Sequence, residues 1–554
     1  MPSDLEIART VTLRPIEDVA AQLGLAPAAL YRHGRHLAKI DMGTVNALRT
    51  RIDGKLILVT AINPTPPGEG KTTTTIGLGD ALNRLGHRTA IALREPSLGP
   101  VFGRKGGATG GGRAQVAPME AINLHFTGDF HAITAAHNLL AALIDNHLYW
   151  GNALGLDPAT IGWRRVSDTN DRALRQVVTG LGGNGAPRET GFDITVASEI
   201  MAILCLADDL ADLQARIGRI VIGRTREGRE VTADELEAAD ALTVLLKDAL
   251  QPNLVQTLEG NPVLVHGGPF ANIAHGCNSV IATRTALKLA DYAVTEAGFG
   301  ADLGAEKFLD IKCRSASLAP AAAVIVATAR ALKYQGGAAV GEVAKPGLAT
   351  LRAGLANLSR HIVNLRRFGL PVAVAINRFD SDEPQELATI AEWTQAEHGV
   401  EAFVCEHHAR GGAGAEELAA HVVDLAARPA QPLNFTYPLD LPLAGKIEAI
   451  ATTIYGATGV AFAPGASKAL ARLQERHGQL PVCIAKTPVS FSADESQRGA
   501  PAGFTLPVRE VRLSAGAGFV VALCGEVMTM PGLPRVPGAT HIRLDAEGRI
   551  EGLS

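Results

Sequence analysis

One hydrophobic pattern repeats along much of the chain. Short runs of consecutive apolar residues, typical of strands buried on both faces of a sheet, alternate with longer stretches in which apolar residues recur at helical spacing. The apolar runs are residues 56–61, 89–93, 263–266, 321–327, 371–376 and 402–405. The helix-like stretches include 71–85, 282–290 and 351–366. This alternation predicts an α/β fold with a largely parallel sheet and helices on both faces.

Towards the C-terminus the pattern changes. After about residue 481, short β-like runs at 511–513 and 519–523 stand between Gly and Pro turns, which predicts a small appended α+β unit. Chains longer than roughly 250–300 residues usually divide into domains, so we expect several domains in a chain of 554 residues. We place a large α/β domain at 1–360, a second α/β domain at 361–475 and the small domain at 476–554.

The composition is that of a well-packed globular protein, with 47% hydrophobic and 19% charged residues. Lys and Arg number 52 and Asp and Glu number 56, and the formal charge of −4 disfavours a nucleic-acid partner. The longest apolar stretches, such as 318–329, are shorter than the roughly 20 residues of a membrane span, and residues 1–20 lack the features of a signal peptide. The six cysteines form no C-x-x-C pair, as expected of reduced thiols. We therefore expect a soluble, cytoplasmic protein without a membrane partner.

A turn rich in Gly and Pro joins the first strand to a helix. Its residues are Thr65, Pro66, Pro67, Gly68, Glu69, Gly70, Lys71 and Thr72. Helix N-termini attract phosphate through their backbone N–H groups and the helix dipole. Gly70 permits close approach of the backbone, Lys71 supplies an ammonium for the β- and γ-phosphates, and Thr72 supplies a hydroxyl ligand for Mg²⁺. The pattern predicts a P-loop NTPase-like domain at 1–360 that binds ATP or GTP, against the alternative of an ordinary turn with a chance Gly-Lys-Thr. The usual P-loop has glycine where this chain has Thr65, so we expect a different bend there.

Arg94 and Glu95 directly follow the apolar run at 89–93. We expect that strand to lie beside the P-loop strand, which would place both residues at the edge where open α/β sheets bind ligands. An arginine there would neutralise charge that develops during phosphoryl transfer. On this pattern alone, a surface ion pair between the two residues remains the alternative.

Four motifs together carry a family resemblance. They read TPPGEGKTT at 65–73, REPSLGPVFG at 94–103, FTGD at 126–129 and MTMPGLP at 528–534. On these motifs the chain resembles formate–tetrahydrofolate ligase, also called 10-formyltetrahydrofolate synthetase. The similarity runs from near Ala38 to the C-terminus and includes the stretches 261–277, 295–307 and 514–519.

The resemblance implies a ligase that joins formate to tetrahydrofolate at the expense of ATP. A formyl phosphate intermediate would give 10-formyltetrahydrofolate, ADP and phosphate. By the same resemblance, Lys71 would hold the transferring phosphoryl group, Arg94 would stabilise charge on formyl phosphate, and Thr72 would ligate Mg²⁺. The resemblance also implies activation by a monovalent cation, K⁺ or NH₄⁺, and a homotetramer.

The resemblance assigns three residues to folate, namely Phe379, His408 and Glu95. Phe379, in an Asn-Arg-Phe turn, would be one wall for the pterin ring. The family usually has tryptophan as the second wall, where this chain has His408, and the smaller imidazole would weaken stacking by about 1 kcal/mol. A second departure is Pro488, where the family commonly has glutamine. Because proline removes an N–H and fixes φ, we expect an altered loop shape there without loss of catalysis.

Two other functions compete with the ligase. A regulatory P-loop ATPase of the partitioning type would carry a signature lysine early in the loop, but this chain has Pro66 there. A relative of the ligase that binds nucleotide but has lost folate activity is supported by His408 alone.

Overall fold

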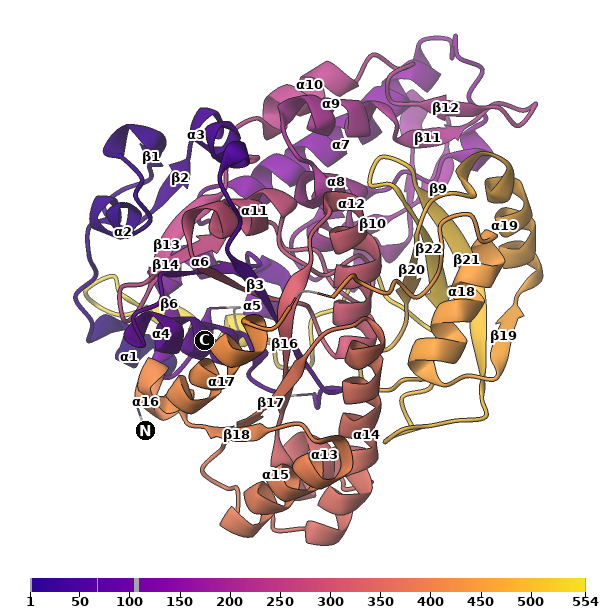
Figure 1. The fold of residues 1–554 in the computed structure, drawn as a ribbon. Coiled ribbons are helices and arrows are strands. Elements are labelled where there is room, and N and C mark those ends of the chain that lie inside the picture. Colours follow the sequence, from indigo (N-terminus) through magenta and orange to yellow (C-terminus); the bar gives the residue numbers. More distant parts are fainter. Residues whose placement is uncertain (1, 67, 104–108, 430, 554) are drawn as a thin grey trace.

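The computed structural model describes residues 2–66, 68–103, 109–429 and 431–553. At its centre lies a large sheet to which these residues contribute twelve strands (Figure 1). The order across the sheet is β1 (Leu30–Arg32), β2 (Ala38–Ile40), β13 (Asn253–Thr257), β14 (Pro262–Val265), β4 (Thr89–Leu93), β15 (Tyr292–Glu296), β3 (Lys55–Ala61), β16 (Pro320–Ala327), β17 (Val372–Asn377) and β18 (Ala402–Cys405), with β6 (Ala114–Ala117) on β13 and β5 (Gly110–Gly111) on β6. All neighbours from β14 to β18 are parallel, whereas the pairs from β1 to β14 are antiparallel. The predicted α/β fold with a largely parallel sheet is confirmed.

Helices cover both faces of the sheet, as the sequence predicts. In β3 the side chains of Ile57 and Val59 share a core cluster with α4 (Lys71–Arg84) and α17 (Glu416–Ala426). The alternate residues Leu56 and Leu58 lie in the cluster that contains α11 (Val280–Leu289) and α14 (Leu348–Arg367). Strands buried on two sides explain the unbroken apolar runs.

Further helices surround this sheet and the C-terminal region. They are α1 (Asp4–Arg9), α2 (Ile16–Gln22), α3 (Met42–Ala47), α5 (Leu98–Phe102), α6 (Met119–Asn123), α7 (Asp129–Tyr149), α8 (Glu199–Leu206), α9 (Leu210–Gly218), α10 (Ala239–Leu246), α12 (Arg314–Ala316), α13 (Ala329–Gln335), α15 (Pro384–His398) and α16 (His407–Arg410). No helix among the described residues has the length and apolar character needed to cross a bilayer. The six cysteines are buried, and none forms a disulfide in the part of the chain that the structure describes.

The connection from β3 through α4 to β4 forms as predicted, but the two strands are not neighbours. β15 lies between them and pairs in parallel with both. The expectation that Arg94 follows a strand beside the P-loop strand is therefore wrong. β15 comes about 200 residues after β4 in the chain. The apolar run of β4 does not reveal this insertion, because tertiary packing decides which strands pair.

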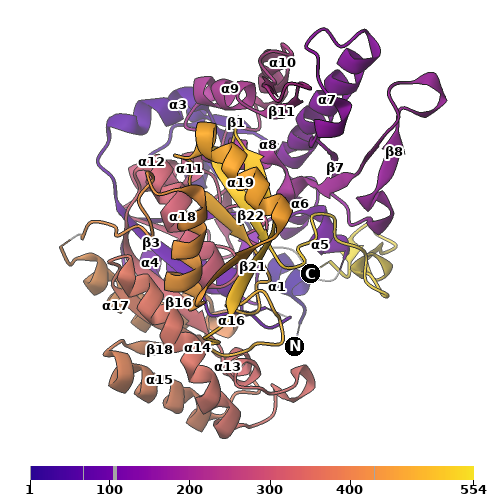
Figure 2. The same cartoon turned by 90° about the vertical axis from the view of Figure 1, so that its right-hand side faces the viewer.

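A second, four-stranded sheet forms near the C-terminus in the order β19 (Gly459–Phe462), β21 (Thr505–Ser514), β22 (Phe519–Cys524), β20 (Val482–Ala485). Helices α18 (Leu443–Ile450) and α19 (Pro464–His477) pack against it (Figure 2). The predicted runs at 511–513 and 519–523 lie in β21 and β22. The domain limits at 360 and 475 stay predictions.

Four further strand pairs stand outside these sheets in the described chain. They are β7 (Arg165–Ser167) with β10 (Phe192–Ile194), β8 (Val177–Thr179) with β9 (Arg188–Thr190), β11 (Val221–Arg224) with β12 (Glu230–Thr232), and β23 (Arg543–Leu544) with β24 (Ile550–Glu551). The two ends of the chain lie close together (Figure 1). Arg9 of α1 donates to the carbonyl of Ile550 at 2.6 Å.

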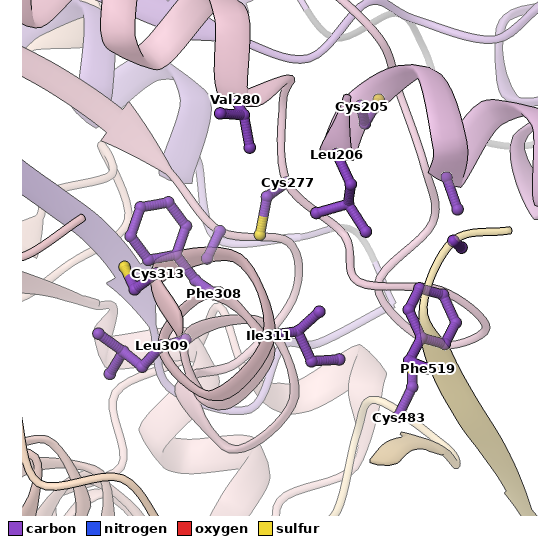
Figure 3. Packing of buried hydrophobic residues seen from close by; sticks show 14 of the residues in the cluster. Cys205, Leu206, Cys277, Val280, Phe308, Leu309, Ile311, Cys313, Cys483 and Phe519 are labelled. Atoms are coloured by element: carbon purple, nitrogen blue, oxygen red, sulfur yellow. The ribbon is translucent and has the colours of Figure 1, made fainter. Parts of the chain in front are cut away.

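One core joins the central sheet to the C-terminal sheet. Figure 3 shows Phe308 and Ile311, from the π-helical segment Phe308–Cys313, among side chains from α8 and from the C-terminal strands, including Phe519. All of these side chains are buried. The C-terminal region is thus packed on the sheet that carries the turn at 65–72.

Candidate active site

A cavity of about 630 Å³ opens at the carboxyl ends of the central strands. Three of the motifs read from the sequence contribute to its lining, together with residues from other parts of the chain. The three motifs are the turn after β3, the residues after β4, and the C-terminal motif, represented by Gly68, Glu69, Gly70, Lys71, Thr72, Arg94, Glu95, Pro531 and Gly532. Ligands of open α/β sheets bind at this edge. Three of the four motifs that carry the resemblance therefore converge on one cleft.

The turn after β3 is held by its own glutamate. The backbone N–H and the hydroxyl of Thr65 both donate to Oε1 of Glu69, each at 2.6 Å. The other oxygen of Glu69 accepts from the hydroxyl of Thr328. Thr65 is buried and Pro66 is exposed, and neither lines the cavity, while Pro67 lies outside the described residues. The threonine that departs from the usual P-loop pattern thus serves as a donor that closes the turn.

Gly70 is required by the geometry of the turn. Its φ of 70° lies in the left-handed region, and a Cβ at this position would collide with the side chain of Asn377. The amide of Asn377 donates to the carbonyl of Glu69 at 3.0 Å. The end of β17 therefore holds the turn in place through Asn377. Helix α4 begins at Lys71, directly after Gly70.

Glu296, at the end of β15, gathers the polar groups of the cleft. It accepts from the hydroxyl of Thr72 at 2.8 Å and from Nε and Nη2 of Arg94 at 3.3 and 3.1 Å. Its side chain is 1% exposed and that of Arg94 is 17% exposed. Burial alone would raise the pKa of Glu296, but the charges of Arg94 and Lys71 and the hydrogen bond from Thr72 hold it below its ordinary value. The site is thus a buried carboxylate among cationic groups.

Sequence reasoning missed Glu296 as a site residue. Its signal was present, since it is a carboxylate at the end of a short apolar run. The run at 292–296 is short and carries none of the four motifs, and only the sheet order shows that it lies between β3 and β4. Arg94 pairs with Glu296 rather than with its neighbour Glu95, so the alternative of a surface Arg94–Glu95 pair is wrong.

Glu95 lines the cavity and lies near a second group of buried charges. Its Oε2 atom has no hydrogen-bond partner among the described residues. Nearby, Asp129 of the FTGD motif forms an ion pair with Lys39, with Nζ and Oδ1 2.8 Å apart and both side chains buried. Burial first, and then the charge of Asp129, raise the pKa of Glu95 well above its ordinary value. Glu95 is therefore biased towards its neutral form.

Phe299 adds an aromatic wall to the cleft. Its φ of 57° is unfavourable for a bulky residue. Backbone conformations of this kind persist where the surrounding structure imposes them, and they cluster at functional sites. Phe299 lines the cavity together with Phe270.

The two predicted ring walls lie outside the lining of this cavity. Phe379 follows β17, and the guanidinium of Arg330 lies 3.4 Å from the centre of its ring. His408 lies in α16, after β18, with its side chain 51% exposed and its Nε2 3.9 Å from a carboxylate oxygen of Asp4. β17 and β18 are neighbours, and an ion pair between Arg378 and Glu406 joins the turns that follow them. The structure thus places both residues at the same edge of the sheet, and their folate role stays a prediction.

The oxygen atoms beside Lys71 suit magnesium. Mg²⁺ in phosphate sites keeps several waters and takes one or two protein oxygens besides the phosphates. Thr72 and Glu296 supply two such oxygens, and Glu296 is held in its charged form. No group of three or more His, Cys, Asp or Glu side chains that could hold a metal occurs among the described residues. The two residues therefore fit a magnesium ion that arrives with a nucleotide.

Fold and cleft together define a class of protein. The sheet is mostly parallel, and its strand ends meet a Gly-Lys-Thr turn at the N-terminus of a helix, with a half-buried arginine lining the same cleft. This is an α/β protein with a cleft suited to phosphate groups.

The chain belongs to the formate–tetrahydrofolate ligase family. The family model described as Formate--tetrahydrofolate ligase matches residues 2–554. The chain is 64% identical over 558 residues to the formate–tetrahydrofolate ligase of Paracoccus denitrificans (strain Pd 1222). It is 62% identical over 558 residues to that of Methylobacterium nodulans and over 556 residues to that of Methylobacterium radiotolerans, and all three alignments cover 100% of both chains. The protein is accordingly an enzyme of the ligase class, and the resemblance stated from the motifs is confirmed. The regulatory ATPase is left without support.

Proposed function

We propose that the protein joins formate to tetrahydrofolate with ATP, through formyl phosphate, and releases 10-formyltetrahydrofolate, ADP and phosphate. The observation that carries this proposal is the convergence of Lys71, Thr72 and Arg94, which line the cleft, on the buried Glu296 beside it. The full-length match to the ligase family supports the same reaction.

The chemistry explains why ATP is needed. Formate is a poor acyl donor, because its leaving group would be hydroxide or oxide. A formate oxygen attacks the γ-phosphorus, the bond from that phosphorus to the bridging oxygen breaks, and ADP leaves. The N10 lone pair of tetrahydrofolate then attacks the formyl carbon, the bond from that carbon to the phosphate oxygen breaks, and phosphate leaves. N10 loses one proton in the process.

The cationic groups act in both transfers. Lys71 holds the β- and γ-phosphates at the N-terminus of α4. Arg94 stabilises the negative charge on formyl phosphate and on the tetrahedral adduct. Magnesium, when bound, neutralises phosphate charge, and Thr72 and Glu296 would hold it. Because Glu296 also fixes Arg94, one carboxylate orients both the arginine and the metal-binding hydroxyl.

Folate would bind along the same edge of the sheet. The guanidinium of Arg330 covers one face of the Phe379 ring, so the pterin stacks on the other face. Glu95, biased towards its neutral form, offers a hydrogen-bond donor in the cleft. His408 replaces the usual tryptophan wall and weakens the stacking. Activation by K⁺ or NH₄⁺ and a homotetramer belong to the same proposal.

The test measures ADP release from ATP and Mg²⁺, with formate and tetrahydrofolate supplied separately and together. The folate product is followed by its acid conversion to the methenyl form. We expect turnover only when both substrates are present, and its loss in Lys71→Ala. Lys55→Ala is the matched control, because Lys55 is an exposed lysine at the other end of β3.

Two other outcomes are informative. ATP hydrolysis that does not depend on formate or folate would overturn the proposed ligase reaction. Formate-dependent ADP formation without a folate product would favour the second candidate, a relative that has lost folate activity, for which His408 is the specific observation.

A further inference from the structure

A buried polar network begins at Asn63, two residues before the turn that carries Lys71. The side-chain amide of Asn63 donates to Oδ1 of Asp302 at 3.0 Å and to the carbonyl of Pro488 at 3.2 Å. Its side-chain oxygen accepts from Asn357 at 2.9 Å, and Nε2 of His361 lies 3.1 Å from the same oxygen. Asn63 is fully buried. The point at which the chain leaves β3 is therefore fixed by groups from distant parts of the sequence.

Asp302 connects Asn63 to the C-terminal region. Its other oxygen accepts from Nζ of Lys486 at 2.7 Å, and both side chains are 0% exposed. Lys486 also donates to the carbonyls of Thr487 and Ser490, so that all three of its N–H groups have acceptors. The lysine thus ties the loop that contains Pro488 to the same carboxylate that holds Asn63.

Two more side chains, those of Gln335 and Asn357, bind this C-terminal loop to the region of the turn. Gln335 donates to the carbonyl of Val489 at 3.1 Å and accepts from the N–H of Gly499 at 2.9 Å. Asn357, which donates to Asn63, also donates to the carbonyl of Gly499 at 2.7 Å. Residues 486–499 are consequently held by five hydrogen bonds, at four residues, against the groups that surround Asn63.

The segment that carries Asp302 is itself unusual. Residues Ala301–Ala305 form a π-helical turn. This conformation is rare in proteins overall, but where it occurs it is often found at functional sites. A Cβ at Gly300 would lie 2.6 Å from Oδ1 of Asp302, so glycine is needed for the close approach. The following segment, Phe308–Cys313, is enclosed by the core that Figure 3 shows. Asp302 therefore has little freedom to move away from Asn63.

A buried ion pair is weak evidence for stability, because well-packed apolar residues often serve as well. The position of this pair suggests another role. We propose that Asp302 and Lys486 are positioning residues for the nucleotide, which hold Asn63 and thereby the start of the phosphate-binding turn, so that residues 486–499 are part of the ATP site's support. This inference rests on the proposed function. The loop with the departure at Pro488 belongs to this support, since the proline's carbonyl accepts from Asn63.

The test uses the full-length chain with Asp302→Leu and Lys486→Met combined. This double variant removes both charges together and takes away one of the two acceptors of the Asn63 amide, leaving the carbonyl of Pro488. We expect the Kd for ATP with Mg²⁺, and the KM for ATP, to rise about fivefold, the effect of one lost buried hydrogen bond. We expect kcat at saturating ATP to fall less than twofold, a split that a general loss of structure would not produce.

The matched control is Lys333→Met combined with Glu386→Leu. That ion pair is 3.1 Å long and equally buried, at 0% and 1% exposure, but lies between α13 and α15. We expect a similar decrease in Tm and a Kd for ATP within twofold of the wild type. A second test variant, Asp302→Asn with Lys486→Met, keeps an acceptor for Asn63 and should restore most of the affinity for ATP.

An unchanged Kd for ATP in the Asp302→Leu/Lys486→Met protein would overturn the inference. If that protein does not fold, Asn63→Ala decides, because it removes the same hydrogen bond and should raise the Kd about fivefold; a wild-type Kd in Asn63→Ala would likewise overturn it. A wild-type protein that fails to bind ATP would instead refute the proposed function. The two failures are therefore distinguishable.

Discussion

Replacing Glu296 by glutamine removes one buried charge and keeps the shape of the side chain. The carboxylate accepts two hydrogen bonds from Arg94 and one from Thr72. Glutamine retains one oxygen, but its amide group is a donor and faces either the guanidinium or the hydroxyl. Arg94 would lose its counter-charge, and the hydroxyl of Thr72 would lose its acceptor or be reoriented.

The magnitude follows from the type of contact. A hydrogen bond to a charged group contributes about 1.5–3 kcal/mol. Arg94 is 17% exposed and is therefore partly screened by solvent, so we expect a loss of about 3 kcal/mol for the site as a whole. When the whole loss raises the activation free energy of phosphoryl transfer, kcat falls about 100-fold. The KM for tetrahydrofolate should change less than threefold, because Glu296 does not touch the predicted folate walls.

The assay is formate- and folate-dependent ADP release, with the Kd for ATP measured separately by titration and Tm measured to confirm folding. Glu416→Gln is the control, since Glu416 forms an exposed ion pair of 2.7 Å with Arg84. A folded Glu296→Gln protein with kcat within threefold of the wild type and unchanged ATP affinity would refute the role of Glu296. Combining Glu296→Gln with Arg94→Leu adds a second check. If Glu296 acts through Arg94, the double variant should lose much less than the product of the two single effects.

Two further predictions concern other parts of the chain. His408→Trp should lower the KM for tetrahydrofolate about fivefold, because a larger ring restores about 1 kcal/mol of stacking. Steady-state kinetics at varied tetrahydrofolate concentration measure this KM. An unchanged or higher KM would mean that position 408 does not contact folate. Burial raises the pKa of Asp80 in α4 to about 7, so the folded protein keeps a proton that the unfolded chain releases near pH 4. Its contribution to the free energy of unfolding therefore falls as pH rises from about 4 to about 7. Asp80→Asn should be more stable than the wild type at pH 8 by up to about 4 kcal/mol, with a smaller difference at pH 5. Urea unfolding at both pH values measures this difference, and Asp424→Asn is the control, because Asp424 is exposed. A stability difference that does not depend on pH would contradict the reasoning.

Local patterns sufficed for much of the fold. The run at 56–61 is buried on two faces, and Gly70 and Lys71 mark the start of α4 where the turn chemistry predicts it. The strands at 321–327 and 402–405 also lie where the apolar runs are. These elements were predictable because a strand between two helical layers must be apolar at every position, which one stretch of sequence displays by itself.

Sheet order is the information that a single stretch does not contain. β15 inserts between β3 and β4, and only this insertion places Glu296 within hydrogen-bonding distance of both Thr72 and Arg94. The same holds for Asn63, Asp302 and Lys486, which are separated by more than 180 residues at each step. Each is an unremarkable polar residue beside an apolar run, and its chemistry arises only when packing brings the three together. The residues that bear a motif were therefore found from sequence, whereas the residues that hold the motif in place required the structure.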